Sequence, residues 1–156
     1  MAPDRPPEGQ ARQMRDGETE TDVAPHMQER ARGLGLTICR PSWSPNTMLV
    51  HEATVYAREK GLDNEFHHAA AGAYWTKGTD FSDKAVLQEL AGKAGLDWNE
   101  LSPRLDSGQY RQQVLDEYQA ARDRGVTGTP TYLINGELLP GDVSLEDLTA
   151  AVKKAG

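Results

Sequence analysis

The stretch of sequence that decides the fold is GVTGTPTYLING, residues 125–136. Two glycines and a Thr-Pro bond lead directly into residues 131–134, a β-branched and aromatic run that favours a strand. Asn135-Gly136 then gives the strongest short signal for a hairpin turn. Because a proline at the start of a strand has no N–H, the backbone groups beside it stay free for another chain. The stretch predicts a tight loop that feeds a hairpin and can bind an extended peptide.

The residues that follow continue this hairpin. Glu137-Leu138-Leu139 can form the second strand, which Pro140-Gly141 ends. Ser144, followed by two acidic residues, predicts the N-cap of a final helix, and Lys153-Lys154 lie near the C-terminus of that helix, where cations suit the helix dipole.

Loop, apolar strand, Asn-Gly turn, second strand and closing helix together resemble the C-terminal half of the DsbA-like thioredoxin-fold oxidoreductases, in particular their FrnE-like branch. The resemblance covers roughly residues 35–156. It implies that Pro130 is a cis-proline, and that Gly128, Thr129 and Pro130 bind the backbone of a substrate beside a redox-active cysteine pair. A cis X-Pro bond is a minority state, so it is the resemblance that implies it and not the local sequence.

The fold class that the resemblance implies is α/β. It is a thioredoxin-like (DsbA-like) fold with a large helical insertion, mostly helical in this chain. Residues 3–9, Pro-Asp-Arg-Pro-Pro-Glu-Gly, resemble the segment that follows the second strand in FrnE-like proteins. We therefore expect an N-terminally truncated chain that lacks the N-terminal β-α-β unit and keeps the C-terminal β-hairpin and helix.

Composition and periodicity divide the chain into four segments. Residues 1–30 contain no Leu, Ile or aromatic residue, which predicts a mobile arm over 1–21. Residues 22–45 are predicted to form a short helix and a connector, residues 46–107 the helical insertion, and residues 108–156 the C-terminal thioredoxin-fold half.

Within these segments, apolar residues recur at helical spacing over residues 22–34, 46–60, 64–77, 82–94, 97–105 and 109–124. Asn46, Ser82 and Asp97 are the predicted N-caps of three of these helices. The predicted helices carry aromatic residues that we expect to pack in a core, with the active-site-facing groove of the family as the alternative: Tyr56, Phe66, Tyr74 and Trp75.

Cys39 is the only cysteine, so the sequence contains no Cys-x-x-Cys motif and no internal disulfide. Thioredoxin-type chemistry needs two cysteines at a helix N-terminus. Cys39-Arg40-Pro41-Ser42 imitates a one-cysteine, glutaredoxin-like site. However, Pro45 should delay the next helix to about Asn46, so Cys39 would lie outside the field of that helix. A buried or half-buried thiol without a redox role is the favoured interpretation.

Charge and composition exclude several classes of partner. A net charge of −7 argues against nucleic acid and against an anionic membrane surface. The sequence has no long apolar run and no apolar signal region at its start, which predicts a cytoplasmic protein. The histidines do not suggest a metal site, since adjacent His67 and His68 point about 100° apart on a helix.

Three functions stay open. The first is thiol–disulfide oxidoreductase or a glutathione-dependent isomerase relative, with the catalytic residue outside this chain. The oxidoreductase needs no cofactor, and the isomerase would use glutathione. The second is a non-catalytic module that binds an extended peptide or a partner strand at Gly128, Thr129 and Pro130. The third is an inert remnant. Loss of the first strand would leave one bare edge on residues 131–134, so we also expect a homodimer through that edge, borrowed strands or instability.

Overall fold

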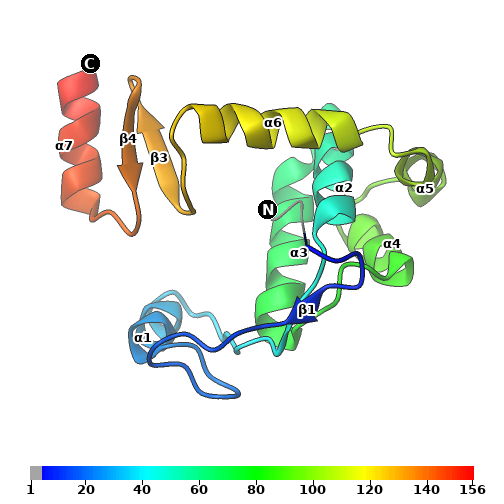
Figure 1. Cartoon of the computed structure of the whole chain (residues 1–156), viewed down its shortest axis with the longest axis horizontal. Coiled ribbons are helices and arrows are strands. Elements are labelled where there is room, and N and C mark those ends of the chain that lie inside the picture. Colours follow the sequence, from blue (N-terminus) through cyan, green and yellow to red (C-terminus); the bar gives the residue numbers. More distant parts are fainter. Residues whose placement is uncertain (1–4) are drawn as a thin grey trace. The chain divides into compact units, whose positions relative to one another are not determined.

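The computed structural model describes residues 5–156 and divides them into two compact units (Figure 1). We call the part up to Val114 the helical unit and Leu115–Gly156 the C-terminal unit. The boundary falls within helix α6, Arg111–Asp123. The four segments expected from the sequence stay predictions, and residues 1–4 of the expected arm lie outside the described residues.

The helical unit has its own hydrophobic core. Its helices are α2 (Met48–Glu59), α3 (Asp63–Lys77), α4 (Lys84–Lys93) and α5 (Trp98–Ser107), followed by the first turn of α6. The largest fully buried apolar side chains come from four different helices: Tyr56, Phe66, Leu87 and Leu101. Burying side chains of this size contributes about 1.5–3 kcal/mol each. The expected core positions of Tyr56 and Phe66 are therefore confirmed, whereas Tyr74 and Trp75 are half-buried.

Of the three predicted N-caps, Asp97 is confirmed, Asn46 lies one residue before the N-cap of α2, which is Thr47, and Ser82 is wrong. The Asn46 side chain accepts from the N–H of Met48 (2.9 Å), and the Asp97 side chain accepts from the N–H of Asn99 (2.8 Å). Ser82 does not cap α4. The carboxylate of Asp80 accepts from both the backbone N–H and the hydroxyl of Ser82, so the next residue, Asp83, caps the helix instead.

The segment before α2 contains helix α1 (Pro25–Gly33) and two strands of two residues each, β1 (Gln10–Ala11) and β2 (Trp43–Ser44). These strands pair antiparallel, with Gln10 opposite Ser44. The sequence did not predict them, because two residues carry no periodicity. Beside them the carboxylate of Glu18 accepts hydrogen bonds from Arg12 (2.5 Å) and Arg40 (3.2 Å), and all three side chains are largely buried.

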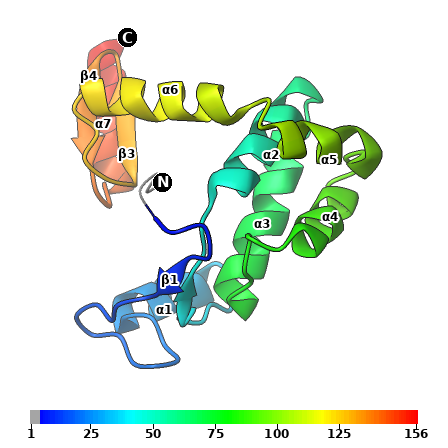
Figure 2. The same ribbon diagram turned by 45° about the vertical axis from the view of Figure 1, so that its right-hand side comes forward.

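The C-terminal unit contains the predicted hairpin and closing helix. Strands β3 (Thr131–Ile134) and β4 (Glu137–Pro140) pair antiparallel, with Ile134 opposite Glu137, and α7 (Leu145–Ala155) packs on them. Asn135 and Gly136 both have positive φ, 48° and 85°, as a two-residue type I′ turn requires. Figure 2 shows α7 lying along the hairpin in a second view. Ser144 caps α7 by accepting from the N–H of Asp147.

Candidate functional site: the loop before β3 and the edge of β3

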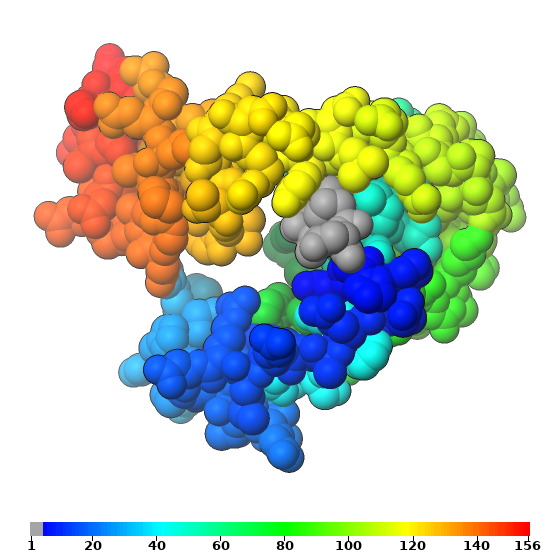
Figure 3. Space-filling view, in the orientation of Figure 1, coloured from blue at the N-terminus to red at the C-terminus, as the bar shows by residue number. Residues whose placement is uncertain are grey.

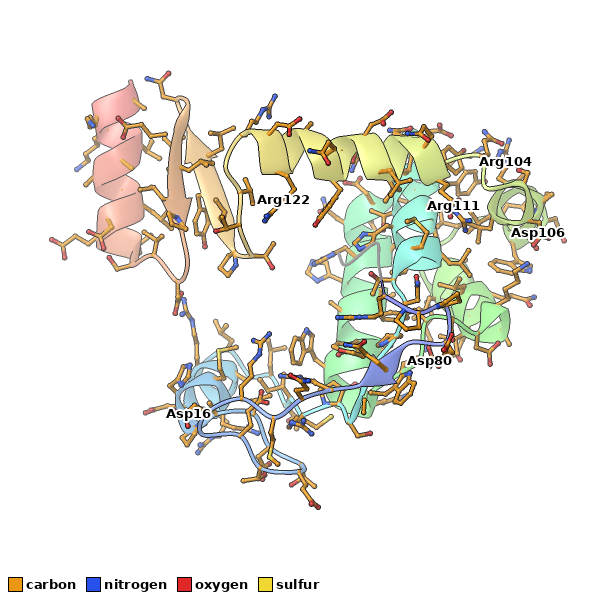
Figure 4. All side chains as sticks on the ribbon, viewed as in Figure 1. Asp16, Asp80, Arg104, Asp106, Arg111 and Arg122 are labelled. Atoms are coloured by element: carbon orange, nitrogen blue, oxygen red, sulfur yellow. The ribbon has the colours of Figure 1, made fainter. Side chains whose placement is uncertain are left out.

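The C-terminal end of α6 fixes the start of the loop that leads to β3. The N–H of Gly125 donates to the carbonyl of Arg122 (2.9 Å), and the N–H of Val126 donates to that of Ala121 (3.0 Å). Gly125 adopts φ 91°, a left-handed conformation that glycine accepts without strain. Arg122, labelled in Figure 4, donates from its guanidinium to the carbonyl of Val126 (3.0 Å). The chain therefore leaves α6 in a defined direction.

The loop itself is exposed yet fixed at both ends. Gly128, Thr129 and Pro130 are all exposed. Figure 3 draws the C-terminal unit that contains them in yellow to red. The Thr131 hydroxyl donates to the carbonyl of Gly128 (2.7 Å), and the N–H of Gly141 donates to the carbonyl of Pro130 (2.9 Å). The Thr129–Pro130 peptide bond is cis.

Thr129 differs from its neighbours in this loop. Among residues 5–156, no hydrogen-bond partner occurs for its backbone N–H or its C=O. Both groups belong to an exposed residue, and the residues on either side are held by hydrogen bonds. An exposed donor and acceptor on a fixed stretch of backbone can bind the main chain of an extended peptide.

The outer edge of β3, which follows Thr129 in the chain, also has free backbone N–H and C=O groups. The bond between Gly141 and Pro130 and the register of the hairpin fix which residues point inward, because inward and outward pairs alternate along an antiparallel ladder. Tyr132 and Ile134 form the hydrogen-bonded pairs with β4. Thr131 and Leu133 consequently direct their N–H and C=O groups away from the hairpin.

The two edges of the hairpin are not equivalent. On β4 the residue opposite Thr131 is Pro140, which has no N–H to direct outward. Proline on an edge strand is one of the devices that prevent pairing with another chain. Within the described residues β3 pairs only with β4. The outer edge of β4 therefore has one N–H fewer than that of β3, and β3 is the better pairing edge.

Cys39 lies elsewhere, in the helical unit. Its thiol is free and half-buried, and its N–H donates to the carbonyl of Trp75 (2.8 Å). Helix α2 begins only at Met48, so no helix N-terminus lies next to the sulfur in sequence.

The histidines are also dispersed. No group of three His, Cys, Asp or Glu residues with metal-binding geometry occurs in the part of the chain that the structure describes. His51 is partly buried, and this burial lowers its pKa because a charged imidazole loses solvation.

A group that sequence reasoning missed is Glu52 on α2. Its side chain is fully buried; Oε1 accepts from the Nε of Arg111 (3.3 Å), and Oε2 has no hydrogen-bond partner among the described residues. Burial raises the pKa of this carboxyl group, although Arg111 acts in the opposite direction. An acidic residue on a helix normally indicates a surface position, so the sequence offered no signal for its burial.

Two tyrosines of the helical unit donate hydrogen bonds to carboxylates, and each of these contacts involves a residue of α2. Tyr110 donates its hydroxyl to Glu59 (2.6 Å), and burial together with this carboxylate raises the pKa of Tyr110 to about 12. Tyr56 donates to Glu100 (3.0 Å), which also accepts from Lys60 (2.8 Å). The contact of Tyr110 attaches the α5–α6 connection to α2, and the contacts of Glu100 attach the start of α5 to the same helix. We assign them a structural role.

Comparison with models of protein families gives a match that covers nearly the whole chain. The family model described as DSBA-like thioredoxin domain matches residues 2–153 of this chain. No curated protein matches the sequence. In addition, no helix among residues 5–156 combines the length and apolar character that crossing a membrane requires.

Proposed function

The chain belongs to the DSBA-like thioredoxin domain family, and we propose that its loop Gly128–Pro130 binds the backbone of an extended peptide for thiol–disulfide exchange, as in the FrnE-like branch. The observation that carries the proposal is Thr129: its N–H and C=O are exposed and without partners in a loop that is fixed on both sides.

The fixed loop makes this binding efficient. A peptide that pairs with Thr129 orders little of the protein, because the carbonyls of Val126, Gly128 and Pro130 already accept hydrogen bonds. Each main-chain hydrogen bond contributes about 0.5–1.5 kcal/mol net, so recognition through one residue is weak and tolerant of sequence. Such tolerance suits a protein that acts on many substrates.

The chemical step needs thiols that this sequence does not contain as a pair. In exchange, a thiolate attacks one sulfur of the substrate disulfide, the S–S bond breaks, and the other sulfur leaves as a thiolate. A second thiol then resolves the mixed disulfide and releases the reduced substrate while the enzyme pair is oxidised. Cys39 is the only cysteine here. We propose that the thiol pair comes from polypeptide outside these 156 residues.

A second candidate is a binding module without catalysis. It is favoured by the single cysteine and by the half-buried position of Cys39 before α2. In this case the loop and the open edge of β3 bind an extended segment, and no bond is made or broken.

Peptide binding is tested by NMR titration of the labelled chain with an extended, disulfide-free peptide. We expect the largest shift at the Thr129 amide. Gly128→Phe should abolish it: nothing lies within 4 Å of a Cβ added at Gly128, so the ring blocks the peptide without disturbing the free protein. Gly72→Phe is the matched control, since the space beside Gly72 is equally open. Equal shifts in both variants would overturn the proposal.

The redox part is tested by insulin reduction with glutathione as the reductant. The chain alone should give no turnover, and addition of a Cys-x-x-Cys-bearing protein fragment that binds it should restore turnover. Turnover by the chain alone that Cys39→Ser abolishes would contradict this account and would assign catalysis to Cys39-Arg40-Pro41-Ser42.

A further inference from the structure

The outer flank of α7 is apolar and exposed. Leu145 is 81% exposed and Val152 58%, and a shallow hollow beside them is lined by Leu148 and Thr149 as well. In α7 no residue is buried. Isolated apolar residues on a surface are ordinary, but these lie at i, i+3, i+4 and i+7 and form one continuous stripe.

The position of this stripe relative to the hairpin follows from the contacts of α7. Lys154 pairs with Glu137 on β4 (3.0 Å), and Ala151 and Ala155 face Ile134 and Leu139. With about 100° per residue, Leu145 and Val152 lie roughly half a turn around the helix from Lys154. Because Lys154 marks the β4 side, the apolar stripe lies on the β3 side. The apolar stripe therefore lies beside the edge of β3 at which Thr131 and Leu133 direct their free backbone groups outward.

We propose that a second copy of this chain occupies that edge, with β3 pairing antiparallel to β3 of the second copy and the two α7 helices packing side by side. A two-fold axis perpendicular to the sheet keeps both helices on one face. The free groups then match: Thr131 pairs with Leu133 of the second copy, and Leu133 pairs with its Thr131. Tyr132 lies on the axis. The partner is self-complementary, as an isologous interface requires.

The dimensions of the elements agree with this arrangement. Strands in a sheet lie about 4.8 Å apart, so the centres of the two hairpins in a four-stranded sheet are about 9.6 Å apart. A helix centred on each hairpin would place the two α7 axes at that separation. Packed helices lie about 8–10 Å apart. One two-fold axis thus satisfies the strand edge and the helix flank together.

Charge complementarity supports a second copy as the occupant. The stripe is bordered on its solvent side by Glu146 near the start of α7 and by Lys153 near its end. When the two helices run antiparallel, Glu146 of one copy lies beside Lys153 of the other, twice per dimer. Within residues 5–156 neither side chain takes part in an ion pair.

Sedimentation velocity over a series of protein concentrations tests the proposal, which requires neither peptide nor thiol. The interface is small, so we expect a reversible dimer with a Kd in the micromolar range. Val152→Lys should raise that Kd about a hundredfold, since each copy loses an apolar contact and gains a facing charge. Ala150→Lys adds the same charge on the other flank of α7 and should leave the Kd unchanged.

A charge exchange distinguishes the interface from a general loss of folding. Glu146→Lys alone and Lys153→Glu alone should each weaken the dimer about tenfold. The double variant Glu146→Lys/Lys153→Glu should restore it. The amide hydrogens of Thr131 and Leu133 should exchange slowly with solvent in the dimer, where they are hydrogen-bonded. In the dilute monomer they should exchange fast.

Three results would overturn the proposal: a monomer at all concentrations, a dimer that Val152→Lys leaves unchanged, or charge variants without rescue. The first result would leave the edge of β3 and the apolar stripe of α7 free to bind a strand and a helix from a different polypeptide. The peptide titration, repeated with the Val152→Lys monomer, decides the proposed function separately, so the two can fail independently.

Discussion

The helical unit and the C-terminal unit contain equally regular elements but differ in what they bury. In the helical unit residues from α2, α3, α4, α5 and the start of α6 form one buried cluster. In the C-terminal unit, all of which the structure describes, no residue is buried. Its hairpin and helix form because the turn, the caps and the periodicity agree, not because a core holds them. Regular secondary structure therefore does not show that a segment is stable by itself.

The largest effect that this comparison predicts is in the core of the helical unit. Phe66→Ala should lower the free energy of unfolding by about 3–5 kcal/mol, because Phe66 is fully buried and the cavity cannot refill completely. Leu133→Ala in the C-terminal unit should change it by less than about 1 kcal/mol in dilute solution, since Leu133 is 51% exposed. Urea unfolding followed by circular dichroism gives both values, and equal losses would contradict the comparison.

The turn of the hairpin provides the next effect. Gly136→Ala should destabilise the hairpin by about 1–2 kcal/mol, because φ is 85° there and a side chain strains that conformation. The β3 and β4 signals in NMR spectra should weaken while those of the helical unit stay unchanged. Simultaneous loss of both sets of signals would mean that the two units fold as one.

A smaller loss of stability is expected at the N-terminus of α4, where Ser82 was the predicted cap and Asp83 is the observed one. Asp83→Ala should cost about 1 kcal/mol, since the N–H of Ala85 loses its acceptor. Ser82→Ala should cost less, because Ser82 bonds to Asp80 and does not cap the helix. Thermal unfolding of the two variants measures the difference, and the reverse order would restore the prediction made from the sequence.

The smallest effect is a pH dependence within the helical unit. The pKa of Glu52 is raised in the folded state by burial. Its contribution to stability is therefore complete below the unfolded pKa, about 4.3, and is lost as the pH rises through the folded value. Glu52→Gln should remove this loss, so the variant gains stability relative to the parent as pH increases towards neutrality.

Glu100 is the control for this pH dependence. Hydrogen bonds from Lys60 and Tyr56 lower the pKa of its carboxyl group, so its contribution is present above the unfolded pKa and is lost on acidification. Glu100→Gln should change the pH dependence with the opposite sign. Urea unfolding at several pH values distinguishes the two, and the same sign for both variants would contradict the account.

The sequence predicted the hairpin because its signals are local: Asn135-Gly136 demands positive φ, and residues 131–134 favour a strand whatever surrounds them. It predicted Ser82 as a cap wrongly because Asp80 competes for the same groups. It did not predict β1 and β2, since Gln10–Ala11 pair with residues more than thirty positions away. Such pairing leaves no local signal.

The candidate site was predictable in its location but not in its details. The sequence and the family resemblance indicated Gly128, Thr129 and Pro130. They did not indicate that both backbone groups of Thr129 stay free between two carbonyls that accept hydrogen bonds, because that depends on the hydrogen bonds of Thr131 and Gly141. The exposed stripe of α7 was equally hidden, since an apolar helix flank in a sequence normally indicates a buried face.

Amide hydrogen exchange of the dilute chain tests most directly the central claim that only the helical unit has a core of its own. We predict that amides of α2–α5 exchange with a free energy of opening close to that of global unfolding, and that amides of β3, β4 and α7 exchange by local opening at much lower cost. Equal protection of both units in the dilute monomer would contradict the account.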